Sequence, residues 1–297
     1  MSGSSIVVLV LILSAASFGF RSAEGLSAGG GQSESDGGTL IAEIAGPAGW
    51  SKMFAVGYHD NHNMLYVSQG GSGSSNKVAY GSYSGGTTVT WTVFDNVDFL
   101  SGLGCYQDDV LYGVTQSNPL APVPYYLYTW QLDSSGIPML PPDVYQLGAP
   151  FATGGFGGCE WDGDYLWILD QNFFVTDDPS IVYKYDVSTH SVVDSWSCSE
   201  VGGFGVACVW DAGNLRVWIS DWSGGNKLIE HTDTGTTGIS YTITASPNDI
   251  AYKYGLGLDG PGFFVGNYNA NNLHFYDHYL TSLARSTWGC IKATFDE

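Results

Sequence analysis

The chain is 297 residues long and carries 29 acidic against 9 basic side chains, a formal net charge of −20 at pH 7. Because binding to nucleic-acid phosphates depends on Lys and Arg, this balance argues against a nucleic-acid partner. Helical periods are absent, Gly, Tyr, Trp and Thr are abundant, and turn-forming clusters recur about every ten residues, a pattern typical of an all-β protein.

The first 25 residues have the features of a secretory signal peptide. Residues 6–13 are continuously apolar, a run too short to cross a bilayer as a helix but suited to a signal peptide. Small residues offer cleavage sites after Ser17 or Gly25, and an uncleaved anchor is the alternative. Residues 26–38, rich in Ser, Gly and acidic residues, are expected to form a flexible lead-in. We therefore expect a secreted or cell-surface protein with no membrane span in the mature chain.

A strand–turn–strand unit recurs five times in the rest of the chain. Each copy carries an aspartate near its turn, at intervals of 48 to 54 residues, namely Asp60, Asp108, Asp162, Asp211 and Asp259. Each second strand carries an aromatic residue in one register, namely Tyr66, Tyr112, Trp167, Trp218 and Phe264. A period of this size with several short strands per unit predicts the blades of a β-propeller.

The third copy shows the expected blade most clearly. Its strands are predicted at residues 156–161, 165–169, 181–186 and 191–198, and third strands are predicted elsewhere at 77–83, 126–133, 227–231 and 272–277. We thus expect residues 39–297 to form a single propeller domain with four antiparallel strands per blade, five blades being favoured over six. Residues 39–45 also form a predicted strand, which could close the last blade, extend an outer edge or mark a degenerate sixth blade. Residues 282–290 are a competing outer strand for the last blade.

Two family resemblances accompany this pattern. The string Trp-Asp-Gly-Asp-Tyr-Leu-Trp-Ile-Leu-Asp at 161–170, followed by Tyr-Lys-Tyr-Asp at 183–186, resembles secreted bacterial propellers of the NHL, YVTN and streptogramin-lyase-like group. The likeness covers nearly the whole mature chain and implies a propeller fold, but its motifs are structural and imply no particular activity. A more distant resemblance to five-bladed glutaminyl cyclases rests on Leu-Tyr-Val-Ser at 65–68. That family's Gly-Glu-Gly-Leu acid has no counterpart in Ser-Gly-Leu-Gly at 101–104, so cyclase activity is not implied.

The cysteines are expected to follow the repeat rather than to form bridges. Cys105, Cys159 and Cys208 each precede a repeat aspartate by three residues. Equivalent positions on different blades are expected to lie farther apart than a disulfide allows, so we interpret these residues as small buried apolar groups. Cys198 and Cys290 match each other on different blades, and their disulfide state is left open.

A candidate ligand-binding face follows from the register of the second strands. Three residues after each repeat aromatic stand Gln69, Thr115, Asp170, Asp221 and Asn267, which should ring one face of the propeller. Loops entering the inner strands place Trp50, Phe99, Phe156 and Phe204 at the same face, and Trp222 adjoins Asp221. We predict that a ligand contacts Gln69, Asp170, Asp221 and Asn267 and stacks on Phe156, Phe204 and Trp222. The alternative is that the polar groups satisfy loop backbone and the aromatics fill gaps between blades.

Metal and cofactor signals are weak, and none is predicted. Asp162 with Asp164, and the Asp177-Asp178 pair, could contribute oxygen ligands to Ca²⁺, although turn chemistry is favoured because no twelve-residue ligand loop is present. His59 and His62 flank a turn where a transition metal could bind, but exposed turn histidines are favoured.

No coherent catalytic set is apparent, and no catalytic residue is predicted. The chain has no Gly-x-Ser-x-Gly elbow between a predicted strand and a helix, and it lacks His-Glu-x-x-His. Glu160, expected beside the central axis, could act as a general base or simply line a water-filled channel. The favoured hypothesis is a module that binds a glycan, peptide or protein ligand on its loop face. The alternative is an extracellular lyase, cyclase or glycan-active hydrolase with a site at the mouth of the central channel.

Overall fold

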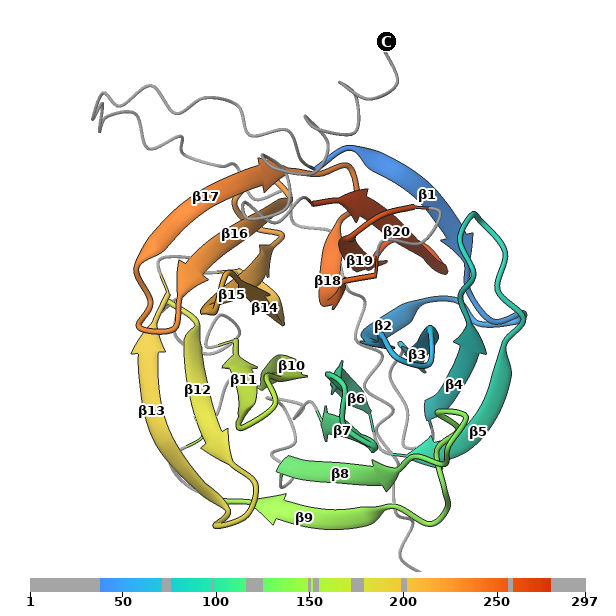
Figure 1. Ribbon diagram of the computed structural model, residues 1–297, viewed down its shortest axis with the longest axis horizontal. Helices are drawn as coiled ribbons and strands as arrows, with labels where there is room; N and C mark the ends of the chain where they lie inside the picture. The colour runs from blue at the N-terminus through green and yellow to red at the C-terminus, as the bar shows by residue number, and fades with distance from the viewer. Residues whose placement is uncertain are drawn as a thin grey trace, which may run out of the picture. The chain divides into compact units, whose positions relative to one another are not determined.

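The chain forms a five-bladed β-propeller (Figure 1). The computed structural model describes residues 38–70, 76–97, 99–115, 125–148, 151, 155–171, 179–198, 202–255 and 259–278. In these ranges it contains five antiparallel sheets of four strands and no helix. Accordingly, no helix long and apolar enough to span a membrane occurs in the described part of the chain.

The first four blades take their strands in chain order from the axis outward. Blades 1 and 2 contain β2 (Met53–His59), β3 (Met64–Gln69), β4 (Asn76–Ser82) and β5 (Thr92–Val97), then β6 (Leu100–Gly104), β7 (Val110–Thr115), β8 (Tyr125–Gln131) and β9 (Asp143–Leu147). Blades 3 and 4 contain β10 (Phe156–Trp161), β11 (Leu166–Asp170), β12 (Ile181–Asp186) and β13 (Ser191–Ser197), then β14 (Gly203–Asp211), β15 (Asn214–Asp221), β16 (Lys227–Thr232) and β17 (Thr237–Thr242). The predicted third strands agree with β4, β8, β12 and β16 to within two residues.

The fifth blade is closed by the N-terminal strand. Its inner three strands are β18 (Pro247–Lys253), β19 (Gly262–Asn267) and β20 (Asn272–Asp277), and β1 (Leu40–Ala45) pairs antiparallel with β20 as the outermost strand. Of the three roles considered for residues 39–45, closure of the last blade is therefore correct. The ring joins chain segments from both ends of the domain, which leaves β20 without an open edge. The competing strand at 282–290 lies outside the described residues.

The hydrophobic core is divided into five clusters, each filling the space between two neighbouring blades. Between blades 5 and 1, for example, Ile44 of β1 packs with Val56, Phe264 and Phe275, all fully or almost fully buried. Innermost strands such as β2 are buried along their whole length, whereas outer strands such as β13 are mostly exposed. Each large apolar side chain buried in this way contributes about 1.5–3 kcal/mol of transfer free energy.

The aromatic register predicted for the second strands is confirmed. In the antiparallel ladders these aromatics oppose one equivalent inner-strand position, in the pairs Gly57↔Tyr66, Gly104↔Tyr112, Glu160↔Trp167, Ala207↔Trp218 and Ala251↔Phe264.

The equivalence expected for the aspartates and cysteines is wrong in detail. Cys159 pairs with Ile168, one residue after the blade aromatic, whereas Cys208 pairs with Val217, one residue before it. The hairpins differ in length, because the last inner pair is Trp161↔Leu166 in blade 3 but Asp211↔Asn214 in blade 4. Counting back from an aspartate therefore reaches different ladder positions. The expected burial nevertheless holds for all three cysteines, and Cys105, Cys159 and Cys208 are free thiols in the structure.

Every inner strand carries a β-bulge at the same position. The ladder between first and second strands shifts register shortly after it begins in all five blades. The paired bulge residues are Phe54-Ala55, Ser101-Gly102, Gly157-Gly158, Phe204-Gly205 and Asn248-Asp249. We call the end of the ring at which inner strands begin and second strands finish the bulge end, and the opposite end the hairpin end. Bulges bend a strand and redirect its side chains, so this shared distortion determines which residues meet near the axis.

The inner strands approach one another closely below the bulges. A Cβ atom on Gly102 would collide with the backbone nitrogen of Cys159, and one on Gly205 would lie 2.7 Å from the Cα atom of Asp249. In the equivalent layer the other blades have Ala55 and Gly158, so Asp249 is its only side chain larger than a methyl group. The small residues thus leave room on the axis for one carboxylate.

Candidate functional site

The predicted ring of second-strand residues exists as a geometric feature of the bulge end. Each of its members pairs with the first residue of the neighbouring inner strand, in the pairs Met53↔Gln69, Leu100↔Thr115, Phe156↔Asp170, Gly203↔Asp221 and Pro247↔Asn267. The common register brings Gln69, Asp170, Asp221 and Asn267 to one end of the propeller, as expected from the sequence. Whether they contact a ligand is a separate question of exposure.

The four polar residues differ in how much of their side chain is accessible. Gln69 and Asn267 are partly exposed at the rim. Asp170 is fully buried. Asp221 is almost fully buried, and its Oδ1 accepts hydrogen bonds from the Ser223 backbone N–H, the Ser223 hydroxyl and the Gly224 N–H. The two carboxylates therefore belong to the interior or hold a loop, and the two amides are the members of this set that are accessible from outside.

Aromatic side chains from four blades form a connected cluster at the bulge end. Phe54 is its centre, with ring centroids 4.6 Å from Phe99, 5.6 Å from Phe204 and 6.1 Å from Tyr268. Phe204 in turn contacts Trp222 edge-on at 6.4 Å. We call these five residues the aromatic cluster. Because aromatic rings supply large, rigid contact area, such a cluster offers a stacking platform.

The cluster has a buried base and an exposed rim. Phe54 and Phe204 are almost fully buried, whereas Trp222 is 37% and Tyr268 is 41% exposed. The ammonium nitrogen of Lys52 lies 4.0 Å from the centre of the Tyr268 ring, a cation–π contact that orients this ring at the surface. Trp222 and Tyr268 are thus the rings on which a ligand can stack.

The aromatic residues at the bulge end differ from the set expected from the sequence. Trp50 was expected at this face, but it is 7% exposed and packs in the core between blades 5 and 1. Phe156 begins β10 at the predicted end, although its side chain is outside what the structure describes. Phe54 was missed, yet it occupies the same bulge position as Phe204, a match that could have been noticed by aligning the starts of the inner strands.

Among the residues that the structure describes, two amides near the bulges have no hydrogen-bond partner. Gln171, directly after Asp170, is 1% exposed, and neither its Oε1 nor its Nε2 has a partner within the described ranges. The same is true of both side-chain polar atoms of Asn248, the bulge residue before Asp249. Buried amides normally pair with protein, water or ligand, so these two side chains are candidate positions for a bound water or ligand.

Two carboxylates lie on the axis below the bulges. Asp249 is fully buried, and its Oδ2 accepts the backbone N–H groups of Val56 at 3.0 Å and Leu103 at 3.1 Å. Burial raises the pKa of Asp249 well above its ordinary value, although these N–H groups oppose the rise. Glu160 is 4% exposed and accepts the Trp161 N–H at 3.0 Å, and burial likewise raises its pKa. Asp249 therefore ties its own strand to β2 and β6, and neither acid is exposed at the mouth of the channel.

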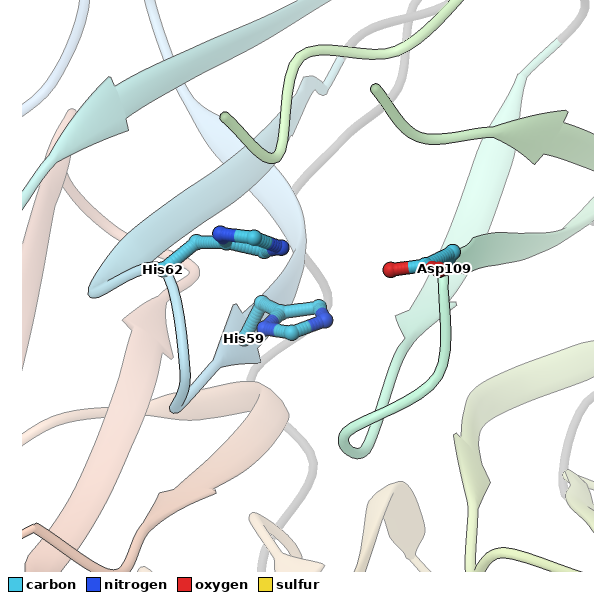
Figure 2. A group of neighbouring side chains, drawn as sticks. All are labelled: His59, His62 and Asp109. Atoms are coloured by element: carbon cyan, nitrogen blue, oxygen red, sulfur yellow. The ribbon is translucent and has the colours of Figure 1, made fainter. Parts of the chain in front are cut away.

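The hairpin end carries a second group of polar side chains. His59, His62 and Asp109 place one potential ligand atom each within 4.8 Å of one another (Figure 2). His59 is fully buried, so the expectation of an exposed turn histidine is wrong for this residue, and His62 is half-buried. Burial lowers the pKa of His59, which favours the neutral imidazole.

At the same end, the structure explains one of the two aspartate groups considered as Ca²⁺ ligands. Asp162 Oδ1 accepts the N–H groups of Asp164 and Tyr165, and its Oδ2 accepts the Trp167 indole N–H. This carboxylate therefore closes its turn, as the favoured interpretation held. Asp177 and Asp178 lie outside the described residues. A surface pocket of about 300 Å³ adjoins this turn and is lined by side chains of both charges, including Asp164, Lys184 and Arg216.

Comparison with known proteins adds a distant likeness of fold. No protein-family model and no curated protein matches the chain. Among solved structures, it is similar to a GH43 glycoside hydrolase whose engineered active site displays both endo-xylanase and exo-arabinofuranosidase activity. The two are 13% identical with a TM-score of 0.48 over 79% of this chain and 51% of the other, so the chain spans about half the length of that structure. Nothing about activity follows from a likeness at this level. The strand topology defines the class of protein, an all-β propeller of five blades.

Proposed function

We propose that the protein is a secreted or cell-surface binding module that takes a glycan or peptide ligand on the bulge end of its propeller. The observation that carries the proposal is the aromatic cluster, in which Trp222 and Tyr268 remain accessible while Phe54 and Phe204 support them from below. The rim amides Gln69 and Asn267 end their strands at the same edge. Planar surface with neighbouring donors and acceptors suits sugar rings and extended peptides, because stacking supplies area and amides supply orientation.

The charge of the chain bears on the kind of ligand. With a formal net charge of −20, the protein repels polyanions at long range. Neutral glycans, and peptides that are neutral or basic, are therefore favoured over sulfated or uronic-acid polymers. The cationic group of Lys52 already occupies the cation–π position over the Tyr268 ring, which disfavours a second cation at this position.

The test is a screen of the whole secreted protein on glycan and peptide arrays, run once with Ca²⁺ and once with a chelator. The proposal expects reproducible binding to a restricted set of neutral or basic ligands, lost when Trp222 and Tyr268 are both replaced by Ala. Turnover of a bound glycan would instead support the enzymatic alternative. Binding that survives the double substitution would show that the ligand site lies elsewhere.

A further inference from the structure

Three side chains from two neighbouring blades converge at the hairpin end. His59 is the last residue of β2, His62 lies in the turn between β2 and β3, and Asp109 lies in the turn between β6 and β7. Figure 2 shows the two imidazole rings one above the other, with the Asp109 carboxylate directed toward them from blade 2. Their potential ligand atoms all lie within 4.8 Å of one another.

The hydrogen bonding of His59 leaves one ring nitrogen available as a ligand. Its Nε2 lies 3.0 Å from the carbonyl oxygen of Asp108. A carbonyl can only accept, so Nε2 carries the hydrogen and Nδ1 carries a lone pair. Nδ1 is buried without a hydrogen-bond partner in the described part of the chain. Metal-binding histidines commonly donate their second N–H to a backbone carbonyl in this way, which fixes the tautomer and the ring orientation.

The surrounding turns hold the other two side chains in place. Asp60 Oδ1 accepts the N–H groups of Tyr254 and Gly255 from blade 5, which anchors the turn that carries His62. The rings of His59 and His62 lie 4.4 Å apart with an angle of 39° between their planes. The backbone carbonyl of Asp109 accepts the Leu132 N–H at 2.8 Å, which anchors the second turn. These contacts fix the positions of the two turns that carry the three side chains.

We propose that His59, His62 and Asp109 form a binding site for a divalent transition-metal ion such as Zn²⁺. Two imidazole nitrogens and one carboxylate oxygen are a donor set that suits such ions and leaves further positions for water or another ligand. The net negative charge of the protein favours the approach of cations. A hard ion such as Ca²⁺ or Mg²⁺ prefers an all-oxygen shell and is not expected to bind here.

A metal at this position would join blade 1 to blade 2. Both histidines belong to blade 1 and the carboxylate belongs to blade 2, so the ion would link two hairpin turns that the His59–Asp108 hydrogen bond already connects. The site lies at the opposite end of the ring from the aromatic cluster. It is therefore independent of the ligand proposed for the bulge end.

The test uses the whole protein, stripped of metal with a chelator and then titrated with Zn²⁺ by calorimetry. We expect one equivalent to bind and to raise the melting temperature, because binding to the folded state alone stabilises it. Loss of a residue that only supports a metal ligand typically weakens metal binding about 10- to 100-fold. Because His62 is itself a proposed ligand, His62→Ala should weaken Zn²⁺ binding by at least this factor. His62 is only half-buried, and circular dichroism will verify that the variant is folded.

His190→Ala is the matched control, since His190 is an exposed histidine in the turn between β12 and β13 of blade 3. It should bind Zn²⁺ like the unaltered protein, and Asp109→Asn should bind more weakly. The proposal is overturned if the unaltered protein takes up no stoichiometric Zn²⁺, if His62→Ala binds it equally well, or if Mg²⁺ competes at comparable concentration.

Discussion

Phe54 and Phe204 meet across the axis of the propeller, with ring centroids 5.6 Å apart, although they belong to blades 1 and 4, which are not neighbours in the ring. Both stand at the first position of a β-bulge, which turns their side chains toward the axis. This contact connects opposite sides of the ring at the bulge end and supports the exposed Trp222 and Tyr268.

Replacing Phe54 by Ala should therefore affect both stability and binding. The side chain is 6% exposed and contacts three other aromatic rings, so its removal is expected to cost about 3 kcal/mol or more of unfolding free energy. Urea denaturation of the purified variant measures this. A loss below about 1 kcal/mol would mean that the cluster is not packed as described.

Asp249 should behave as a structural acceptor on the axis. Asp249→Ala leaves the N–H groups of Val56 and Leu103 without their acceptor, at about 1–3 kcal/mol for each group. Asp249→Asn retains an acceptor oxygen, so we expect it to be less destabilised. The order of the two melting temperatures, Asn above Ala, checks the assignment, and the reverse order would contradict it.

The raised pKa of Asp249 predicts a characteristic pH dependence. Its folded-state pKa lies above the unfolded value of about 3.9, so between these two pKa values the folded state binds more protons. Its contribution to stability is therefore greatest below the unfolded pKa and decreases as pH rises toward the folded pKa. Unfolding free energies of the native protein and of Asp249→Asn, measured across that window, should diverge by up to about 1.4 kcal/mol per pH unit. Parallel curves would show that the carboxyl group has an unshifted pKa.

The thiols of Cys105, Cys159 and Cys208 should be unreactive in the folded protein. Burial raises the pKa of each well above its ordinary value, so little thiolate forms at neutral pH. We expect negligible labelling by a thiol reagent until the protein is unfolded, and unmodified peptides in mass mapping under non-reducing conditions. Finding any of the three in a disulfide would refute this prediction.

Much of the fold could be predicted because its signals are local. The alternation at residues 181–186 coincides with β12, and the repeat aromatics keep one ladder register. Ladder positions near the hairpins could not be counted from the aspartates, since hairpin length varies between blades. The distant contacts were equally hidden, because Asp109 meets His59 across two neighbouring blades and Phe54 meets Phe204 across the closed ring. The sequence pattern also did not predict which side chains are exposed, since Asp170 is fully buried.

The most direct test of the proposed binding face is calorimetric titration of Trp222→Ala and Tyr145→Ala with the tightest ligand found on the arrays. Tyr145 is a matched control, since it is 39% exposed on the outer strand β9 and Trp222 is 37% exposed at the bulge end. We predict that Trp222→Ala weakens binding by about 1–3 kcal/mol with little change in melting temperature, while Tyr145→Ala binds normally. If Trp222→Ala binds the ligand with unchanged affinity, whether or not its melting temperature falls, the bulge end is not the ligand-binding face.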